Sequence, residues 1–466
     1  MPRFKNPEEK RGFMLTTPIP RLVTSMALPS IAAMIITSLY NLADTFFVSK
    51  LGTSATGAVG VNGSIDTIIM MASSLFAAGS ASYTARLLGA GRVQRAREVL
   101  STCYFATVIM GVLVTILGFS FTDPMLRLLG ANEEVLPYSR EYCSYILLAV
   151  PFMTSSFVLN QNLRAEGSSL YSMIGMVTGA VLNIGLDPLF IFGLGWGVAG
   201  ASAATALSKL VSWTILMTPY LRKQTVLTIK LRQFRPRWAD AKDVCSMGSA
   251  SFFRGGLSAL AAIVLNRLAS GYSTSALAAI SVSNRIIMFL TSACLGFGQG
   301  FQPVAGFSWG AGRFDRVRKS YYFAQAACVA GISVISLVVF VFARQLLLLF
   351  TEGNEEMLRI GVYSLRIQCA AMPLHGGCII VNMLCAGLGR PVSSVFLGIG
   401  RQGLFFYPLL PVMVHFFGVW GVASIQAVAD VLNACMAAPI AVHVMREIIQ
   451  REKEASGALP QQIAVS

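Results

Sequence analysis

The chain contains a series of long apolar segments, each nearly free of charge over the length of a helix. About 20 apolar residues suffice to cross a bilayer as a helix, which satisfies its backbone hydrogen bonds internally. Membrane strands would instead show a weak alternation over about ten residues. We therefore expect an all-α polytopic membrane protein. The sequence predicts twelve transmembrane helices, near residues 22–48, 57–82, 97–121, 136–160, 170–193, 196–221, 246–271, 276–306, 317–343, 358–385, 391–415 and 417–445.

Composition and charge distribution agree with this class. The 466 residues are 55% hydrophobic and only 12% charged, which lies outside the range of soluble proteins. The formal net charge of +15 comes from Lys and Arg in short connections, a pattern that orients membrane proteins, so we expect no nucleic-acid binding. Basic residues gather in every second connection, beginning with the N-terminal segment. Both termini are therefore expected to be cytoplasmic.

The longest and most polar connection divides the chain into two halves. The expected parts are a cytoplasmic N-terminal segment at 1–21, an N-lobe of six helices at 22–221, a cytoplasmic linker at 222–245, a C-lobe of six helices at 246–445 and a cytoplasmic tail at 446–466. We expect the tail to be disordered from Gln450 onward because it mixes charges with small residues. No cleaved leader is expected, because the first apolar run is too long for a signal-peptide core.

The two halves repeat each other. The sequence Leu88-Gly-Ala-Gly-Arg92 recurs as Trp309-Gly-Ala-Gly-Arg313, and Asn132-Glu-Glu recurs as Asn354-Glu-Glu. Further matches are Pro151 with Pro373, Pro188 with Pro408, and Trp196-Gly-Val-Ala with Trp420-Gly-Val-Ala. Because each copy has an even number of spans, both enter the membrane from the same side as parallel repeats. Two six-helix bundles of this kind are typical of transporters.

Two carboxylates lie in the apolar segments of the first half only. Asp44 is near the end of the first segment and Asp187 is on the fifth, whereas Ala261 and Tyr407 occupy the aligned places in the second half. Because hydrocarbon disfavours a charge, a membrane acid is kept mainly where it faces a bundle interior or a water-filled cavity, often as an ion relay. The alternative is that each acid merely lies at the outer end of its helix.

Three further residues extend this candidate site. Asn183 precedes it by four residues, so both side chains share a helix face and can act on one ion or proton. Pro188 removes a backbone donor and favours a bend beside the pair. Thr205, on the sixth segment, can supply a hydroxyl. Two repelling acids in a low-dielectric pocket would load a proton or sodium ion from outside, which then weakens the attraction for a cationic substrate.

Other charged residues lie within the segments. Asp66 is in the second segment, Lys209 in the sixth and Asp430 in the twelfth. Lys209 has two interpretations: it is a counter-charge beside Asp44 or Asp187, or it extends along its helix toward the cytoplasm. We expect packing or interface roles for the remaining charged and histidine side chains, among them Arg254, Arg366, Arg401 and His375.

The most distinctive segments are Tyr40-Asn-Leu-Ala-Asp-Thr, Arg164-Ala-Glu-Gly167, Asn183-x-x-x-Asp187-Pro and Gln302-Pro-x-x-Gly-x-x-x-Gly-Ala-Gly-Arg313. Together they resemble the multidrug and toxic compound extrusion (MATE) transporters, most closely the prokaryotic branch of the DinF and MepA types. The resemblance covers nearly all twelve spans. It implies a V-shaped exporter of bulky, mainly cationic or aromatic compounds, working by antiport with H⁺ or Na⁺ in the cell (inner) membrane.

The resemblance also implies roles for individual residues. The coupling ion, H⁺ or Na⁺, would act at Asp44, Asn183, Asp187 and Thr205. The substrate cavity would be lined by Tyr40, Asn160 and Met176, and Pro29 would bend the first helix. Asp66, Lys209 and Asp430 fall outside the family pattern and are possible accessory residues. Acids that other members carry on the seventh and tenth spans are absent, so we expect no coupling through the C-lobe.

Several classes of function remain to be compared. We expect no enzymatic activity, no cofactor beyond the coupling ion, organic cations or drugs and the lipid bilayer as partners, and a monomer. A flippase for lipid-linked precursors would need a strongly basic cavity. A passive channel or receptor would not need the asymmetric acid pair. An intramembrane enzyme would need a constellation of ligands or nucleophiles, whereas the three histidines lie on separate spans.

Overall fold

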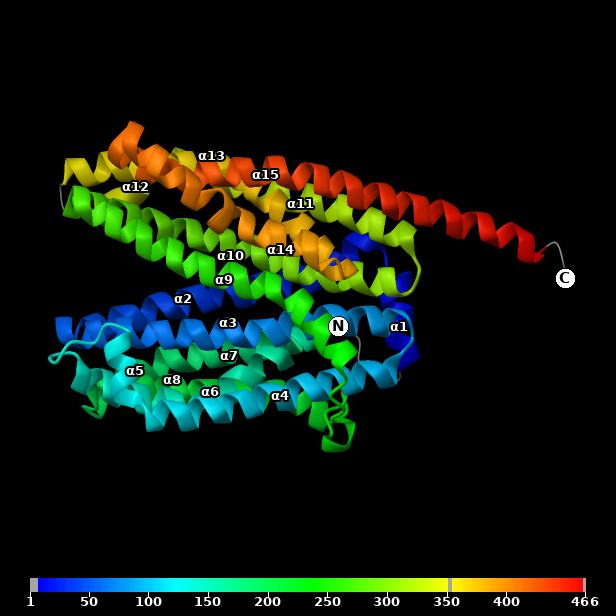
Figure 1. Ribbon diagram of the computed structural model, residues 1–466, viewed down its shortest axis with the longest axis horizontal. Helices are drawn as coiled ribbons and strands as arrows, with labels where there is room; N and C mark the ends of the chain where they lie inside the picture. Colours follow the sequence, from blue (N-terminus) through cyan, green and yellow to red (C-terminus); the bar gives the residue numbers. More distant parts are fainter. Residues whose placement is uncertain (1–6, 351–353, 464–466) are drawn as a thin grey trace. The chain divides into compact units, whose positions relative to one another are not determined.

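The computed structural model describes residues 7–350 and 354–463, and within them the chain forms helices and no strands (Figure 1). The helices are α1 (Pro7–Thr16), α2 (Ile19–Ser49), α3 (Thr53–Gly89), α4 (Val93–Ser120), α5 (Thr122–Leu128), α6 (Leu136–Ala165), α7 (Ser169–Pro188), α8 (Gly197–Leu221), α9 (Trp238–Tyr272), α10 (Thr274–Gly310), α11 (Phe314–Val341), α12 (Ala343–Leu348), α13 (Glu355–Leu388), α14 (Pro391–Ile399) and α15 (Phe406–Ile463). Two π-helical turns, η1 (Leu189–Gly193) and η3 (Gly400–Leu404), and the short 3₁₀ helix η2 (Leu231–Gln233) complete the order.

The predicted membrane spans all fall on these helices. Ten helical stretches of the described chain are long and apolar enough to cross a membrane. One of them, Pro391–Ser456, is divided by Gly418, whose backbone leaves the helical region at φ 55° and ψ −132°. With α8, a helix of 25 residues, the chain has the twelve transmembrane helices that the sequence predicts.

The internal repeat is visible in the helices themselves. Helices α3 and α10 have 37 residues each, and α4 and α11 have 28 each. The repeated Asn-Glu-Glu sequence serves the same purpose twice. The side-chain oxygen of Asn132 accepts a hydrogen bond from the N–H of Val135 at 2.9 Å, and that of Asn354 accepts one from Met357 at 3.0 Å. Asn354 is thus the N-cap of α13, and Asn132 makes the same contact in the turn just before α6.

The chain divides into two compact units. Unit 1 comprises Met1–Phe13 and Ala32–Gly248, and unit 2 comprises Met14–Ile31 and Ser249–Ser466. The division does not follow the expected lobes at two helices. The first part of α2 belongs with the second half of the chain, and the first part of α9 belongs with the first half.

Close contacts at glycines explain why the first part of α9 packs in unit 1 and the first part of α2 in unit 2. In unit 1, a Cβ on Gly79 would lie 2.7 Å from the carbonyl carbon of Val244, and one on Gly248 would lie 2.8 Å from the Cα of Leu75. In unit 2, a Cβ on Gly296 would lie 2.6 Å from the Cα of Ile31. Glycine therefore lets α9 touch the α3 backbone in one unit, while α2 touches the α10 backbone in the other.

Arginines beside the two repeated Gly-Ala-Gly-Arg sequences bind the start of α9 and the residues just before α2. Arg95 donates to the carboxylate of Asp240, at the start of α9, at 2.7 Å. The corresponding Arg316 donates to the carbonyl of Thr17, just before α2, at 2.7 Å, and to that of Met14 at 3.2 Å. Arg95 and Arg316 each lie three residues after a Gly-Ala-Gly-Arg sequence. Arg95 thus holds the start of α9 in unit 1, and Arg316 holds the start of α2 in unit 2.

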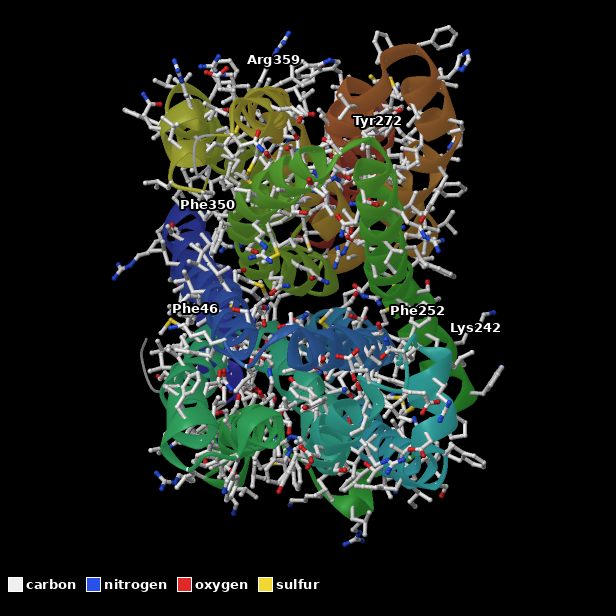
Figure 2. The ribbon with its side chains drawn as sticks, turned by 90° about the vertical axis from the view of Figure 1, so that its left-hand side faces the viewer. Phe46, Lys242, Phe252, Tyr272, Phe350 and Arg359 are labelled. Atoms are coloured by element: carbon white, nitrogen blue, oxygen red, sulfur yellow. The ribbon has the colours of Figure 1, made fainter. Side chains whose placement is uncertain are left out.

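The linker and the tail contain more helix than the sequence suggested. Helix α9 already begins at Trp238, so the last part of the expected linker is helical, including Lys242 (Figure 2). The tail was expected to be disordered from Gln450, but α15 continues to Ile463 (Figure 1). Ion pairs explain part of this: Glu452 accepts from Arg318 at 2.9 Å. Residues 1–6 of the N-terminal segment and 464–466 of the tail lie outside the described residues.

The N-terminal helix is fixed to unit 1 by a buried ion pair. The Lys10 ammonium lies 3.2 Å from the Glu166 carboxylate and donates to the Ser168 hydroxyl at 2.7 Å. The other Glu166 oxygen accepts from the backbone N–H of Leu227 in the linker. Burial is the largest influence on Lys10 and lowers the pKa of its ammonium, while Glu166 acts in the opposite direction. The Arg164-Ala-Glu-Gly167 sequence therefore joins α1, the end of α6 and the linker.

Candidate coupling site

Three helices of unit 1 contribute the candidate site, each through two side chains four residues apart. Helix α2 supplies Tyr40 and Asp44, α7 supplies Asn183 and Asp187, and α8 supplies Thr205 and Lys209. Because residues four apart share one face of an α-helix, each helix presents both of its polar groups on the same side. We call these six residues the N-lobe cluster.

Direct hydrogen bonds join α7 to α8. The side-chain amide of Asn183 donates to the Asp187 carboxylate at 3.1 Å and to the Thr205 hydroxyl at 3.2 Å. All three side chains are buried, with Asp187 fully inaccessible and Asn183 exposed by 1%. The predicted pairing of Asn183 with Asp187 along one helix face is therefore present, and Thr205 completes it.

Helix α2 brings its polar residues to the same place. The carboxyl groups of Asp44 and Asp187 approach each other closely enough to interact. The Lys209 ammonium lies 5.0 Å from the centre of the Tyr40 ring, a cation–π contact, and its charge also acts on Asp44. Lys209 is therefore a neighbour of the acids, as the first of its two interpretations held.

Two residues outside the cluster border on it. Asp66 of α3 interacts electrostatically with both Lys209 and Asp44. Tyr142 of α6 is almost completely buried and interacts with Asp44, Asp66 and Asp187. Sequence reasoning missed Tyr142, because a tyrosine in an apolar segment looks like any packing residue. With Asp66 included, three carboxylates face one ammonium, so the site has a formal charge of −2 when all are ionised.

Several buried oxygens of the site have no hydrogen-bond partner among the described residues. They are Oδ1 of Asp44, Oδ1 of Asp66, Oδ1 of Asn183 and Oδ2 of Asp187. A buried polar atom without a partner is costly, so such atoms mark places for a proton, a water molecule or an ion. The described residues contain no group of three or more His, Cys, Asp or Glu side chains suited to a metal ion. A cation here would instead be held by mixed carboxylate, amide and hydroxyl oxygens.

The three residues proposed to line a substrate cavity are divided between two places. Tyr40 lies in the N-lobe cluster, whereas Asn160 and Met176 lie near the connection of α6 to α7. Asn160 donates to the carbonyl of Ser172 at 3.4 Å, and the Met176 sulfur accepts from Arg164 at 3.1 Å.

The Asn160 contact recurs in the second half of the chain. There Asn382 donates to the carbonyl of Ser394 at 3.1 Å, at the equivalent junction of α13 with α14. A contact kept in both repeats indicates that Asn160 joins two helices. That function is independent of any substrate.

The two prolines named for helix bends differ in their surroundings. Pro29 lies inside α2, which continues without interruption, two residues before the chain passes from unit 2 to unit 1. Pro188 ends α7, and the backbone changes there to the π-helical turn η1. Such π-helical turns are common at functional sites, and this one begins two residues after Asp187.

Asp430, the third accessory candidate, belongs to unit 2 and does not join the N-lobe cluster. Its carboxylate accepts two hydrogen bonds from Arg401, at 2.5 and 3.1 Å, and lies 3.3 Å from the Nδ1 of His375. Asp430 is exposed by only 2%. Arg401 therefore does more than pack helices: it is the counter-charge of a buried acid.

A family model named MatE matches residues 29–189 and again 251–412. The two matches cover one repeat each and together more than half of the chain. The chain belongs to the MatE family. MatE proteins are membrane transporters, which agrees with the twelve spans and the duplicated architecture. The polar site of α2, α7 and α8 lies mainly within and just after the first matched region.

Curated MatE relatives extend over almost the whole chain. It is 27% identical over 430 residues to the multidrug export protein MepA of Staphylococcus saprophyticus, covering 92% of this chain and 94% of that one. It is also 27% identical over 449 residues to MepA of Staphylococcus aureus, covering 94% and 97%. The resemblance to the MepA type is thereby confirmed.

Solved MatE structures share the fold. One is the outward-facing conformation of a multidrug resistance MATE family transporter, with a TM-score of 0.89, 25% identity, and coverage of 97% of this chain and all of that one. Another is a MOP superfamily transporter from Pyrococcus furiosus, with a TM-score of 0.88, 25% identity, and coverage of 96% of this chain and 99% of that one.

Proposed function

We propose that the protein is a secondary active multidrug exporter that couples the outward movement of organic compounds to inward movement of H⁺ or Na⁺ through the N-lobe cluster. The multidrug export proteins that it resembles over more than nine-tenths of its length support the export of drugs. The approach of Asp44 to Asp187 beside unpartnered buried oxygens supports the ion coupling.

The chemistry of the cluster explains how one site can serve both ions and substrate. Two neighbouring carboxylates in a low-dielectric interior repel each other, so binding of one cation or proton between them is favourable. That binding removes negative charge from the site and weakens its attraction for a cationic substrate. Ion and substrate need not share an atom; they need only favour different conformations of the transporter.

Lys209 and Asp66 change the net charge of the site to which the coupling ion binds. Because Lys209 interacts with Asp44 and Asp66, one of the three negative charges is already balanced. A neutral site therefore requires two further positive charges. Coupling cations or protons supply them in one conformation, and a positively charged substrate takes their place in the other.

We further propose that the protein acts as a monomer in the cell membrane with both termini in the cytoplasm. The charge distribution supports this orientation. Lys and Arg gather in the N-terminal segment, the linker and the two loops that follow Gly-Ala-Gly-Arg, whereas the alternate connections are almost free of them.

The experiment that tests this function is efflux of a fluorescent cation such as ethidium from proteoliposomes. A proton gradient and then a sodium gradient are imposed on the parent and on Asp187→Asn. The matched control is Asp123→Asn, which removes an exposed carboxylate paired with Arg140. We expect gradient-driven efflux in the parent and the control and its loss in Asp187→Asn. Absence of gradient-driven flux in the parent would contradict the proposed function.

A further inference from the structure

The first Gly-Ala-Gly-Arg sequence borders a pocket of about 460 Å³ in unit 1. Tyr83 and Leu87, near the end of α3, line it together with residues 91–95 at the start of α4. Residues 90–92 are exposed, so the pocket opens at the protein surface. Because α3 and α4 are both long and apolar enough to span the membrane, the short loop between them lies at a membrane surface. The pocket is therefore within reach of lipid headgroups.

Two arginines at this pocket have no counter-charge. No carboxylate lies within ion-pair distance of Arg92 among residues 7–350 and 354–463, whereas Arg95 is paired with Asp240 at 2.7 Å. Arg11 of α1 is close by, since its guanidinium would lie 3.8 Å from a Cβ on Gly91. Arg11 likewise has no ion pair in the described part of the chain and is exposed. The pocket thus has an excess of positive charge.

The equivalent loop of unit 2 provides a counter-charge at the same place. Arg313 donates to the two carboxylate oxygens of Asp315, at 3.2 and 3.4 Å. The repeat aligns Arg313 with Arg92 and Asp315 with Gln94. Because Gln94 has no charge, Arg92 lacks the partner that its counterpart has.

The same contrast holds five residues further along each helix. Arg318 of α11 is paired with the carboxylate of Glu452 at 2.9 Å. Its counterpart in α4, Arg97, donates instead to the backbone carbonyl of Val226, at 2.9 and 3.0 Å. Unit 1 therefore leaves two positive charges unbalanced where unit 2 balances both.

The start of α4 adds to the attraction for an anion. Its N-cap residue, Arg92, accepts no hydrogen bond with its side chain, and its first turn contains no acidic residue. The first turn of α11 contains Asp315. The free N–H groups and the dipole at the start of a helix favour a negative charge, so they act in the same direction as the two arginines.

The position of the pocket indicates which anion it meets. Anionic phospholipids give the cytoplasmic membrane surface a negative potential that attracts Lys and Arg. A guanidinium can bind a phosphate group through two parallel hydrogen bonds. Leu87 and the ring of Tyr83 provide apolar surface on the α3 side of the pocket, which suits the part of a lipid that joins the headgroup to the acyl chains.

We propose that this pocket binds the headgroup of an anionic phospholipid, with Arg92 and Arg11 holding its phosphate. The site is separate from the N-lobe cluster and does not depend on the proposed export function. Arg11 follows Lys10, whose ion pair with Glu166 fixes α1 to unit 1. A lipid bound by Arg11 and Arg92 therefore adds a second link between α1 and the loop from α3 to α4.

The test compares two lipids with the same acyl chains, the anionic phosphatidylglycerol and the zwitterionic phosphatidylcholine. The purified full-length protein in detergent is titrated with each lipid, and bound lipids are counted by native mass spectrometry. The variants are Arg92→Gln, Arg11→Gln and the double variant. The matched control is Arg313→Gln, which removes the equivalent arginine of unit 2, where Asp315 already supplies a counter-charge. In a further titration, inorganic phosphate competes with bound phosphatidylglycerol.

We expect the parent to bind one phosphatidylglycerol more tightly than phosphatidylcholine. Each single variant should weaken this binding by about fivefold, which corresponds to about 1 kcal/mol for one arginine near the surface, and the double variant by about 25-fold. Arg313→Gln should resemble the parent, and no variant should change the binding of phosphatidylcholine.

Three results would overturn the inference. They are equal affinity of the parent for both lipids, unchanged phosphatidylglycerol binding in the double variant, and the same loss of binding in Arg313→Gln. Displacement of phosphatidylglycerol by an equal concentration of inorganic phosphate would also contradict it, because the pocket would then be a site for free phosphate. Thermal unfolding without added lipid should be the same in all variants, since Arg11 and Arg92 are exposed and unpaired among the described residues.

Discussion

Replacing Gly79 by alanine tests the backbone contact between α3 and α9. The added Cβ would lie 2.7 Å from the carbonyl carbon of Val244, and still closer to its oxygen, whereas ordinary contacts begin at 3.4 Å. The two helices would have to separate by about 0.7 Å or more at this point, and overpacking of this kind costs about 1–3 kcal/mol. In a free helix the same change would stabilise by about 0.5–1 kcal/mol, because alanine loses less entropy than glycine.

Two glycines of α3 provide matched controls. A Cβ on Gly60 or Gly63 would meet no atom within 4 Å. We therefore expect the midpoint of thermal unfolding in detergent to fall by a few degrees for Gly79→Ala and to stay level or rise for Gly60→Ala and Gly63→Ala. Gly248→Ala should behave like Gly79→Ala, since it removes space at the other end of the same contact. If Gly79→Ala were as stable as the two controls, the close packing of α9 on α3 would be refuted.

Three further predictions follow from the buried charges. Lys10→Met leaves the Glu166 carboxylate buried without its counter-charge, which should lower the free energy of unfolding by about 3–5 kcal/mol, and adding Glu166→Gln should recover most of the loss in a denaturation experiment. Asp430→Asn should destabilise by a similar amount, because it leaves the Arg401 guanidinium unpaired, and the thermal midpoint should rise again in the double variant with Arg401→Gln. An unrecovered loss in either double variant would contradict the pairing. Lys209→Met removes the positive charge beside the acids, so half-maximal activation should need about tenfold less coupling cation, and an unchanged requirement would show that Lys209 is too far away to matter.

Much of the architecture could be predicted because it depends on local sequence patterns. Apolar runs of helical length determine the spans, and the repeated Gly-Ala-Gly-Arg and Asn-Glu-Glu sequences reveal the duplication. The spacing of Asn183 and Asp187 was enough to predict that their side chains lie together, because residues four apart in a helix share a face. The structure shows a hydrogen bond between them at 3.1 Å.

Contacts between distant parts of the chain could not be predicted in the same way. Whether Lys209 lies beside the acids or extends away depends on how α2 packs against α8. The exchange of the first parts of α2 and α9 depends on glycines such as Gly79 and Gly296, and a glycine in a helix does not reveal which backbone it meets. Arg401 looked like a packing or interface residue, because sequence alone does not show that it pairs with the buried Asp430.

Asp44→Asn shows whether the N-lobe cluster couples ion entry to substrate export. This substitution keeps the size and polarity of the side chain and removes its charge. The measurement is ethidium efflux from proteoliposomes containing equal amounts of inserted parent or variant protein, under an imposed proton or sodium gradient. We expect that the gradient no longer drives efflux in the variant. Efflux equal to that of the parent would contradict it.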